Sequence, residues 1–181
     1  AASDVYKRQS LDDAVRLAKT SAVPLAFADV ADNPGGGGRG NTMWILDAFH
    51  RAGVTDAIIG IIADAPLAAE AHALGVGARF TARFNRAVAA DDPFSKPFVA
   101  EAEIRALSDG NVTGRRGIFA GRSVRLGRTA WLQIGGIAVV VIEGRTQCAD
   151  PVFLEHLGLD IGRARACLLY TSDAADDLLC V

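Results

Sequence analysis

In the first half of the chain, apolar residues recur at helical spacing in three segments, and short continuously apolar runs separate these segments. The continuous runs have the length and composition of buried strands. Because helices alternate with buried strands, the pattern predicts a sheet that is covered by helices. The predicted helices are Leu11–Thr20 with Ser10 as its cap, a helix from Asn41 or Thr42 to about Ala52, and Pro66–Leu74; the predicted strands are Pro24–Val30 and Asp56–Ala63.

The second half has a different pattern, in which apolar and polar residues partly alternate along several extended segments. Gly135–Gly136 lies between two apolar runs and is a strong signal for a two-residue hairpin. The sequence therefore predicts one α/β domain, with a helix-covered sheet in the first half joined to an antiparallel, β-rich second half. The predicted strands are Gly77–Asn85, Phe98–Leu107, Thr129–Ile134 and Ile137–Ile142, followed by a short helix over Pro151–Leu157.

Composition narrows the classes of function. The net charge of the 181 residues is −2, which gives no electrostatic field for binding nucleic acid or an anionic membrane. The densest apolar run, Ile137–Ile142, is far shorter than the roughly 18 residues of a membrane span, and no signal peptide is visible. The three cysteines form no metal-ligand or disulfide pattern. We therefore expect a soluble, cytoplasmic protein that binds neither nucleic acid nor membranes.

Both ends of the chain differ in character from the rest. Residues 1–9 read AASDVYKRQ and residues 167–181 read CLLYTSDAADDLLCV. These segments resemble translated sequencing adapters that occur at the ends of unrelated metagenomic reading frames. We therefore expect the native portion to be Ser10–Ala166 and interpret that portion alone.

The most distinctive segment is Asp32–Gly40, with the sequence DNPGGGGRG, which is not expected to form regular structure. Consecutive glycines allow positive φ and close approach of a ligand, and amides before a helix favour an anion or a carboxylate. Gly35, Gly37 and Gly40 formally match the dinucleotide pattern G-x-G-x-x-G, with Asp64 after the next strand. However, a run of glycines matches this pattern by default, and the preceding Asp-Asn-Pro lengthens the turn. A nucleotide- or anion-binding module therefore remains the alternative, and a purely structural or dimerisation domain is a third.

Asp29, Asp32 and Asn33 follow the first predicted strand, next to the glycine-rich segment. Oxygen groups at the carboxyl edge of a sheet are typical of ligand sites in α/β proteins. Asp and Asn also stabilise turns by hydrogen bonding to nearby backbone, and the local sequence favours this structural role. The three histidines, His50, His72 and His156, form no metal-binding motif, and we expect them to be packing or surface residues. We expect Cys148 to be a buried thiol.

Five arginines lie close together in the second half of the chain, at positions 115, 116, 122, 125 and 128. They favour a solvated face or an interdomain contact.

Several segments together resemble a known family, the C-terminal domain of MlrC-like (microcystinase C-like) zinc metallopeptidases. The resemblance is strongest in ADNPGGGGRGNT at Ala31–Thr42 and covers nearly all of Ser10–Ala166. It continues through GVGARFTARF at Gly75–Phe84, GIFAGRSVRLGRT at Gly117–Thr129, QCADP at Gln147–Pro151 and GLDIGRAR at Gly158–Arg165.

This resemblance implies a two-domain, zinc-dependent hydrolase of peptide or amide bonds. The zinc ligands would lie in an N-terminal domain that this sequence does not include, so no metal ligand is assigned here, and we expect the fragment, which is truncated at its C-terminus, to be inactive by itself. The expected partners are that domain in cis, a peptide or amide substrate, and a second copy in a possible homo-oligomer. The resemblance places Asp32 and Asn33 as catalytic residues facing the cleft, and as substrate-binding residues Gly35, Gly36, Gly37, Gly38, Asn41 and Thr42.

Overall fold

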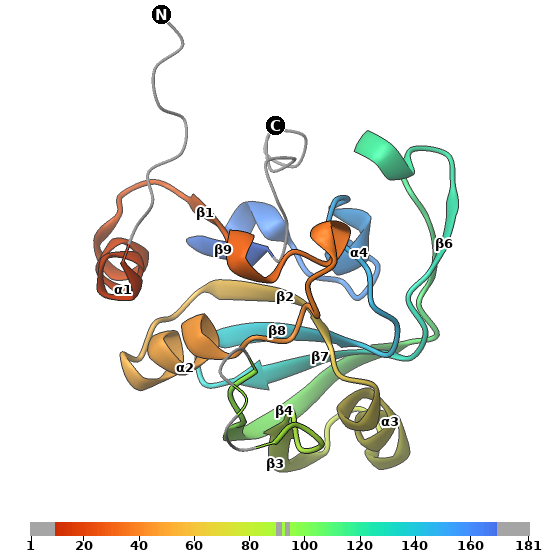
Figure 1. The fold of residues 1–181 in the computed structure, drawn as a ribbon, viewed down its shortest axis with the longest axis horizontal. Helices are drawn as coiled ribbons and strands as arrows, with labels where there is room; N and C mark the ends of the chain where they lie inside the picture. The colour runs from red at the N-terminus through yellow and green to blue at the C-terminus, as the bar shows by residue number, and fades with distance from the viewer. Residues whose placement is uncertain (1–9, 90–91, 93–94, 170–181) are drawn as a thin grey trace, which may run out of the picture.

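A mixed β-sheet forms the centre of the computed structural model, which describes residues 10–89, 92 and 95–169 (Figure 1). Within these residues the sheet has seven strands in the order β1-β9-β2-β8-β7-β4-β3. The strands are β1 (Leu25–Ala28), β2 (Ala57–Ala63), β3 (Arg79–Phe84), β4 (Phe98–Ser108), β7 (Thr129–Ile134), β8 (Ile137–Ile142) and β9 (Ala166–Leu169); β5 (Asn111–Thr113) and β6 (Ser123–Arg125) form a separate ribbon. The helices are α1 (Leu11–Thr20), α2 (Trp44–Arg51), α3 (Ala65–Leu74) and α4 (Val152–Glu155).

The sheet has a parallel half and an antiparallel half. β1, β9, β2 and β8 pair in parallel, whereas β8, β7, β4 and β3 pair in antiparallel. The α/β class and the antiparallel hairpin at Gly135–Gly136 are confirmed. The division between the halves does not follow the chain, because β8 and β9 from its second half join the parallel strands. All six residues of β8 are buried, so this strand lies inside the sheet with both faces covered.

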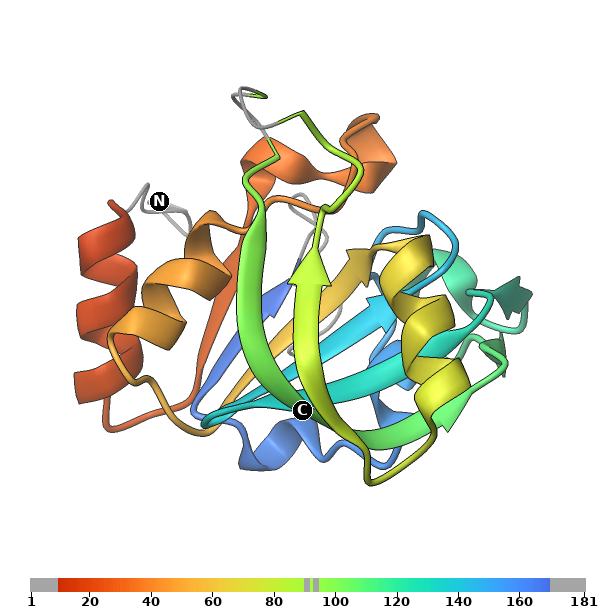
Figure 2. The same cartoon turned by 90° about the horizontal axis from the view of Figure 1, so that it is seen from below.

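Each face of the sheet packs against its own hydrophobic core. On one face α1, α2 and α3 cover the sheet (Figure 2). Leu46, Phe49 and Leu67 are fully buried on this face. On the other face Phe153 and Leu154 of α4 pack on the sheet beside the β5–β6 ribbon. This layering leaves the loop after β1 and the start of α2 at one end of the sheet, where the candidate site lies.

Three local predictions were wrong in informative ways. The first strand is not buried: all four residues of β1 are half-buried, because β1 is the outermost strand of the parallel half. Asn41 and Thr42 do not cap α2, which begins at Trp44 with Met43 in the capping position. The glycine-rich segment is not wholly irregular, since it contains the short 3-10 helix Pro34–Gly36, directly after another at Val30–Asp32.

Residues 167–169, which the sequence places in an adapter-derived tail, form β9 together with Ala166. β9 lies between β1 and β2 and pairs in parallel with both. Residues 1–9 and 170–181 lie outside the described residues. The native boundaries at Ser10 and Ala166 therefore stay predictions.

The buried face of β4 offers a matched test of the core. We expect Ile104→Ala to lower the free energy of unfolding by about 2–5 kcal/mol, because Ile104 is fully buried and its truncation leaves a cavity. Val99→Ala on the same strand should cost less than about 1 kcal/mol, since Val99 is 55% exposed. Urea denaturation of both variants is the measurement, and equal losses would contradict the assignment of faces.

Candidate functional site

A cavity of about 530 Å³ lies where the loop after β1 meets α1 and the start of α2. The carboxyl ends of parallel strands are the usual ligand-binding edge of an α/β sheet. The polar lining of the cavity comes mainly from the loop after β1, which contributes Asp29, Asp32, Arg39 and Thr42. Ser10, Leu11 and Ala14 of the first helix, Trp44 and Ile45 of the second, and Ala31, Gly38 and Ser95 complete it.

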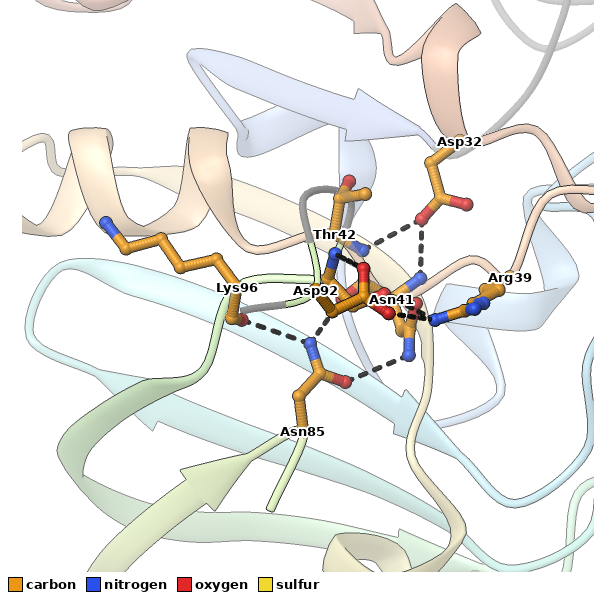
Figure 3. A network of polar contacts seen from close by, with 8 residues as sticks. Asp32, Arg39, Asn41, Thr42, Asn85, Asp92 and Lys96 are labelled. Atoms are coloured by element: carbon orange, nitrogen blue, oxygen red, sulfur yellow. Dashed lines mark hydrogen bonds and ion pairs between the residues drawn. The ribbon is translucent and has the colours of Figure 1, made fainter. Parts of the chain in front are cut away.

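Asp32 holds the loop in place from inside. Asp32 is only 4% exposed, and its carboxylate accepts three backbone N–H groups. The donors are Gly40 at 2.8 Å, Asn41 at 2.6 Å and Thr42 at 2.8 Å. Figure 3 shows Asp32 beside Asn41 and Thr42. Hydrogen bonds from backbone N–H groups to an ionised carboxylate are among the stronger ones in proteins. The sequence predicts that the amides before the second helix bind an anion or a carboxylate. In the structure, the carboxylate that the amides of residues 40–42 bind is that of Asp32.

The backbone N–H groups of the four glycines find their hydrogen-bond acceptors within the loop, mainly on Asn33. The Asn33 side-chain oxygen accepts the N–H of Gly35, and its backbone carbonyl accepts those of Gly36 and Gly38. The N–H of Gly37 donates to the carbonyl of Pro34. The amides of residues 35–38 are thus all used within the loop, so they do not form a free cradle for a phosphate.

Close packing and backbone conformation explain two of these glycines. A Cβ at Gly38 would lie 2.7 Å from the backbone nitrogen of Asn33, which cannot move aside without shifting the loop. Gly37 has a φ of +96°, which side chains rarely adopt. A Cβ at Gly35 would meet only the flexible end of the Gln147 side chain. Gly37 and Gly38 therefore have a structural explanation in the fold of their own loop.

A network of side chains ties the loop to the end of β3 (Figure 3). Asn85 donates to the backbone carbonyl of Asn41 at 2.6 Å and accepts from the Asn41 side chain at 3.0 Å. Ser95 donates to the Asn41 side-chain oxygen at 3.2 Å. Arg39 donates to Asp92 at 2.7 Å. Asn41 therefore braces the loop against the rest of the fold, and it does not line the cavity.

Asp64, which the dinucleotide pattern would assign to a ribose, has a structural position. One carboxylate oxygen accepts the N–H of Leu67 at the start of α3, and the other accepts the N–H of Asn85. Asp64 thus caps a helix and fixes Asn85, which has a φ of +55°. Both uses anchor the network that supports the glycine-rich loop.

Asp29 is the carboxylate that keeps capacity for a ligand. It accepts the N–H of Ala31 and the hydroxyl of Thr42, each at 3.1 Å, and it lines the cavity. Burial raises the pKa of Asp29, and the nearby charge of Asp32 raises it further. Such a desolvated carboxylate in a cavity is a candidate binding group.

Only some of the residues that the resemblance assigns to the site line the cavity. Asp32, Gly38 and Thr42 line the cavity, whereas Asn33, Gly35, Gly36, Gly37 and Asn41 do not. Sequence reasoning noted Asp29 but favoured a turn role for it, and it missed Arg39 and Trp44. A charged residue directly after a strand was the available signal for Asp29, whereas the wall that Trp44 forms with α1 exists only in the folded chain.

The described residues contain no group of three or more His, Cys, Asp or Glu side chains that could hold a metal ion. Each histidine has a contact of its own: His50 packs edge-on against Phe98, His72 meets the carbonyl of Thr129, and His156 meets that of Val152. Cys148 is buried, and burial raises the pKa of its thiol. These residues do not fit a zinc site, so no step through zinc is assigned to them.

The three hydrogen bonds of Asp32 lead to a direct test. We expect Asp32→Asn to lower the free energy of unfolding by about 3 kcal/mol, because an amide cannot replace a carboxylate that accepts three N–H groups. Amide hydrogen exchange should accelerate at Gly40, Asn41 and Thr42. Asp12→Asn on the exposed side of α1 should change stability by less than about 1 kcal/mol. Unchanged exchange at the three amides would show that Asp32 does not hold the loop.

Comparison with known proteins places this geometry in a family. The family model described as MlrC C-terminus matches residues 27–171. The chain is 30% identical over 161 residues to Microcystinase C of a Sphingomonas species, a match that covers 88% of this chain and 30% of that protein. The chain therefore spans less than a third of the length of this curated relative.

A solved structure has the same fold. It is a protein from Mesorhizobium sp. BNC1 that carries the provisional name of a metallopeptidase, and it aligns with a TM-score of 0.80 at 21% identity. The alignment covers 96% of this chain and 35% of that one. The family match spans most of the chain, including the glycine-rich loop and the residues of β9, so the chain belongs to the MlrC C-terminus family.

Proposed function

We propose that this chain forms the substrate-side wall of a zinc-dependent metallopeptidase or amide hydrolase. The zinc ligands would belong to an N-terminal domain in cis, as the resemblance implies. Membership of the MlrC C-terminus family supports this proposal, as do the names of the two relatives, both much longer than this chain. When bound, zinc supplies Lewis-acid chemistry that polarises a scissile carbonyl.

The observation that carries the proposal is the cavity beside the glycine-rich loop. Its half-buried carboxylate, Asp29, can accept a hydrogen bond from a substrate, and Trp44 provides an aromatic wall. Asp32 and Asn33 shape the loop that presents these groups, so we assign them a positioning role in the wall. The rigid loop pre-orients the contact, which limits the entropy lost on binding.

The geometry weakens the alternative of a nucleotide- or anion-binding module. The amides of Gly35 to Gly38 donate within the loop, and Asp32 occupies the amides of residues 40–42. A phosphate would meet the negative charges of Asp29 and Asp32 at the cavity. We therefore favour a peptide or amide substrate.

Location is a separate part of the proposal. No helix in the described ranges is long and apolar enough to cross a membrane. The nearly balanced charge of the chain supports our proposal that the full-length protein is cytoplasmic.

Variants of a full-length relative can test whether Asp29 contacts the substrate. We expect replacement of the residue matched to Asp29 by Asn to raise KM for a peptide substrate about tenfold, with a smaller change in kcat, because a binding contact is lost. The matched Asp109→Asn change in the turn after β4 should leave both constants unchanged. Steady-state kinetics are the measurement. Unaltered KM in the Asp29 variant would contradict the proposed contact.

The chain by itself should be inactive. The described residues do not provide a metal-ligand set, so the purified 181-residue chain is expected to show no peptide hydrolysis with added zinc. Hydrolysis of a fluorogenic peptide library is the measurement, with a full-length relative as the positive control. Zinc-dependent turnover by the chain would refute the assignment of the metal ligands to another domain.

A further inference from the structure

Two carboxylates lie side by side in the cavity next to the glycine-rich loop. Thr42 connects them, since its N–H donates to Asp32 at 2.8 Å and its hydroxyl donates to Asp29 at 3.1 Å. Both aspartates line the cavity. Neighbouring like charges oppose each other's ionisation, and a positively charged ligand relieves this repulsion. The pair therefore favours a cation in the cavity.

The two carboxylates differ in how firmly their acceptor sites are used. An ionised carboxylate has about four acceptor sites, and Asp32 already uses three for backbone N–H groups. Asp29 accepts one N–H and one hydroxyl, each at 3.1 Å, and the backbone N–H of Asp32 makes a weaker contact with it, so its acceptor sites are less firmly used than those of Asp32. Its burial raises its pKa, so a charged donor would gain more there than at a solvated carboxylate. A ligand cation is thus expected at Asp29.

The basic side chain in the described lining of the cavity is already paired. Arg39 is the basic residue among the described residues that line it, and Arg39 pairs with Asp92 at 2.7 Å and contacts Ser95 at 3.3 Å. Lys96 lies over the ring of Trp44 at 5.0 Å and pairs with Asp47. With these pairs in place, the charge of Asp29 and Asp32 is not neutralised by a basic side chain in the described lining.

The remaining wall of the cavity is apolar. Leu11 and Ala14 of α1 face it together with Trp44 and Ile45 of α2, and Trp44 is 46% exposed. An exposed aromatic ring beside a desolvated carboxylate suits a ligand with a cationic head and an apolar stem. The volume of about 530 Å³ is in the range of small-ligand sites and accommodates one end of a peptide.

We propose that this cavity binds a primary ammonium group on an apolar stem, with the ammonium at Asp29 and the stem against Trp44 and Leu11. The inference rests on the proposed function, for which it names the chemistry that the substrate-side wall recognises. The ammonium has two possible sources with the same chemistry, the amino terminus of a peptide and the side chain of a lysine. The test separates these sources.

Three ligands that differ in charge provide the test on the 181-residue chain. Phenylalanyl-alanine amide has a free amino terminus, its N-acetyl form has no cation, and Nα-acetyl-lysine methylamide has only the side-chain ammonium. By isothermal titration at about pH 6.5, we expect saturable binding of at least one ammonium ligand, about tenfold tighter than the acetylated dipeptide. The ligand that binds more tightly identifies the source.

Two variants and one control link binding to the cavity. Asp29→Asn should abolish the preference for the ammonium ligands. Trp44→Ala should weaken all three ligands by a similar factor, and its exposed position makes it compatible with folding. Asp109→Asn makes the same change of net charge in an exposed turn and should leave the affinities unchanged. Circular dichroism confirms that each variant is folded.

The pH dependence gives an independent readout. Between about pH 4 and pH 6.5 the dipeptide amine stays protonated, since its pKa is about 7.7. Because the pKa of Asp29 is raised, this carboxyl ionises at a higher pH than an ordinary aspartate, and affinity should increase as the pH rises. Among the described residues, the charged groups that line the cavity with Asp29 are Asp32 and Arg39, and the lining residues of α1 and α2 carry no charge. The increase should be smaller in Asp29→Asn.

Three results would overturn the inference: equal affinity for the acetylated and free dipeptides, an ammonium preference that persists in Asp29→Asn, or no saturable binding by any of the ligands. These outcomes are distinct from failure of the proposed function, because the titration does not involve hydrolysis. If the chain binds ammonium but the matched variant of a full-length relative keeps its KM, the proposed function fails and this site stands. If KM rises but the chain does not bind ammonium, this inference alone fails.

Discussion

The hydrogen bonding of the Asp32 carboxylate is the interaction on which the site depends. One buried side chain accepts the N–H groups of Gly40, Asn41 and Thr42, and these residues connect the glycine-rich loop to α2. If the carboxylate were absent, three backbone donors would lose their partner next to the core, which is costly. α2 begins directly after these residues, with Met43 at its cap. The hydroxyl of Thr42 donates to Asp29.

A second set of contacts fixes the loop from its other side. Asn85 and Ser95 hold Asn41 from the end of β3 and the segment before β4, while Gln147 packs against Gly35. Residues far apart in the chain therefore meet at one end of the sheet. The loop is braced on both sides, and the cavity between it, α1 and α2 has walls set by packing. A braced wall of this kind suits the recognition of a substrate better than a flexible phosphate loop.

Much of the fold could be predicted because local patterns reflect burial. Ser10 caps α1 as predicted, and the apolar runs around Gly135–Gly136 form the predicted hairpin. The extended runs Phe98–Leu107 and Asp56–Ala63 correspond closely to β4 and β2. Strand order could not be predicted, since it depends on contacts between distant segments. The insertion of β9 between β1 and β2 is the clearest example, because nothing local in Ala166–Leu169 specifies its neighbours.

For the site, the sequence by itself determined that an oxygen-rich, glycine-rich loop follows the first strand, and it determined the family through the residues around that loop. The tertiary structure decided what each polar group does. Asp29, Asp32 and Asn33 all offer side-chain oxygens next to the same loop. In the folded chain Asp32 accepts three backbone N–H groups and Asn33 lies outside the cavity, whereas Asp29 lines the cavity with fewer strong hydrogen bonds. The reason is physical: a carboxylate or amide oxygen is available to a ligand only if the folded backbone does not already occupy its acceptor sites. That occupancy is set by the arrangement of the chain in space.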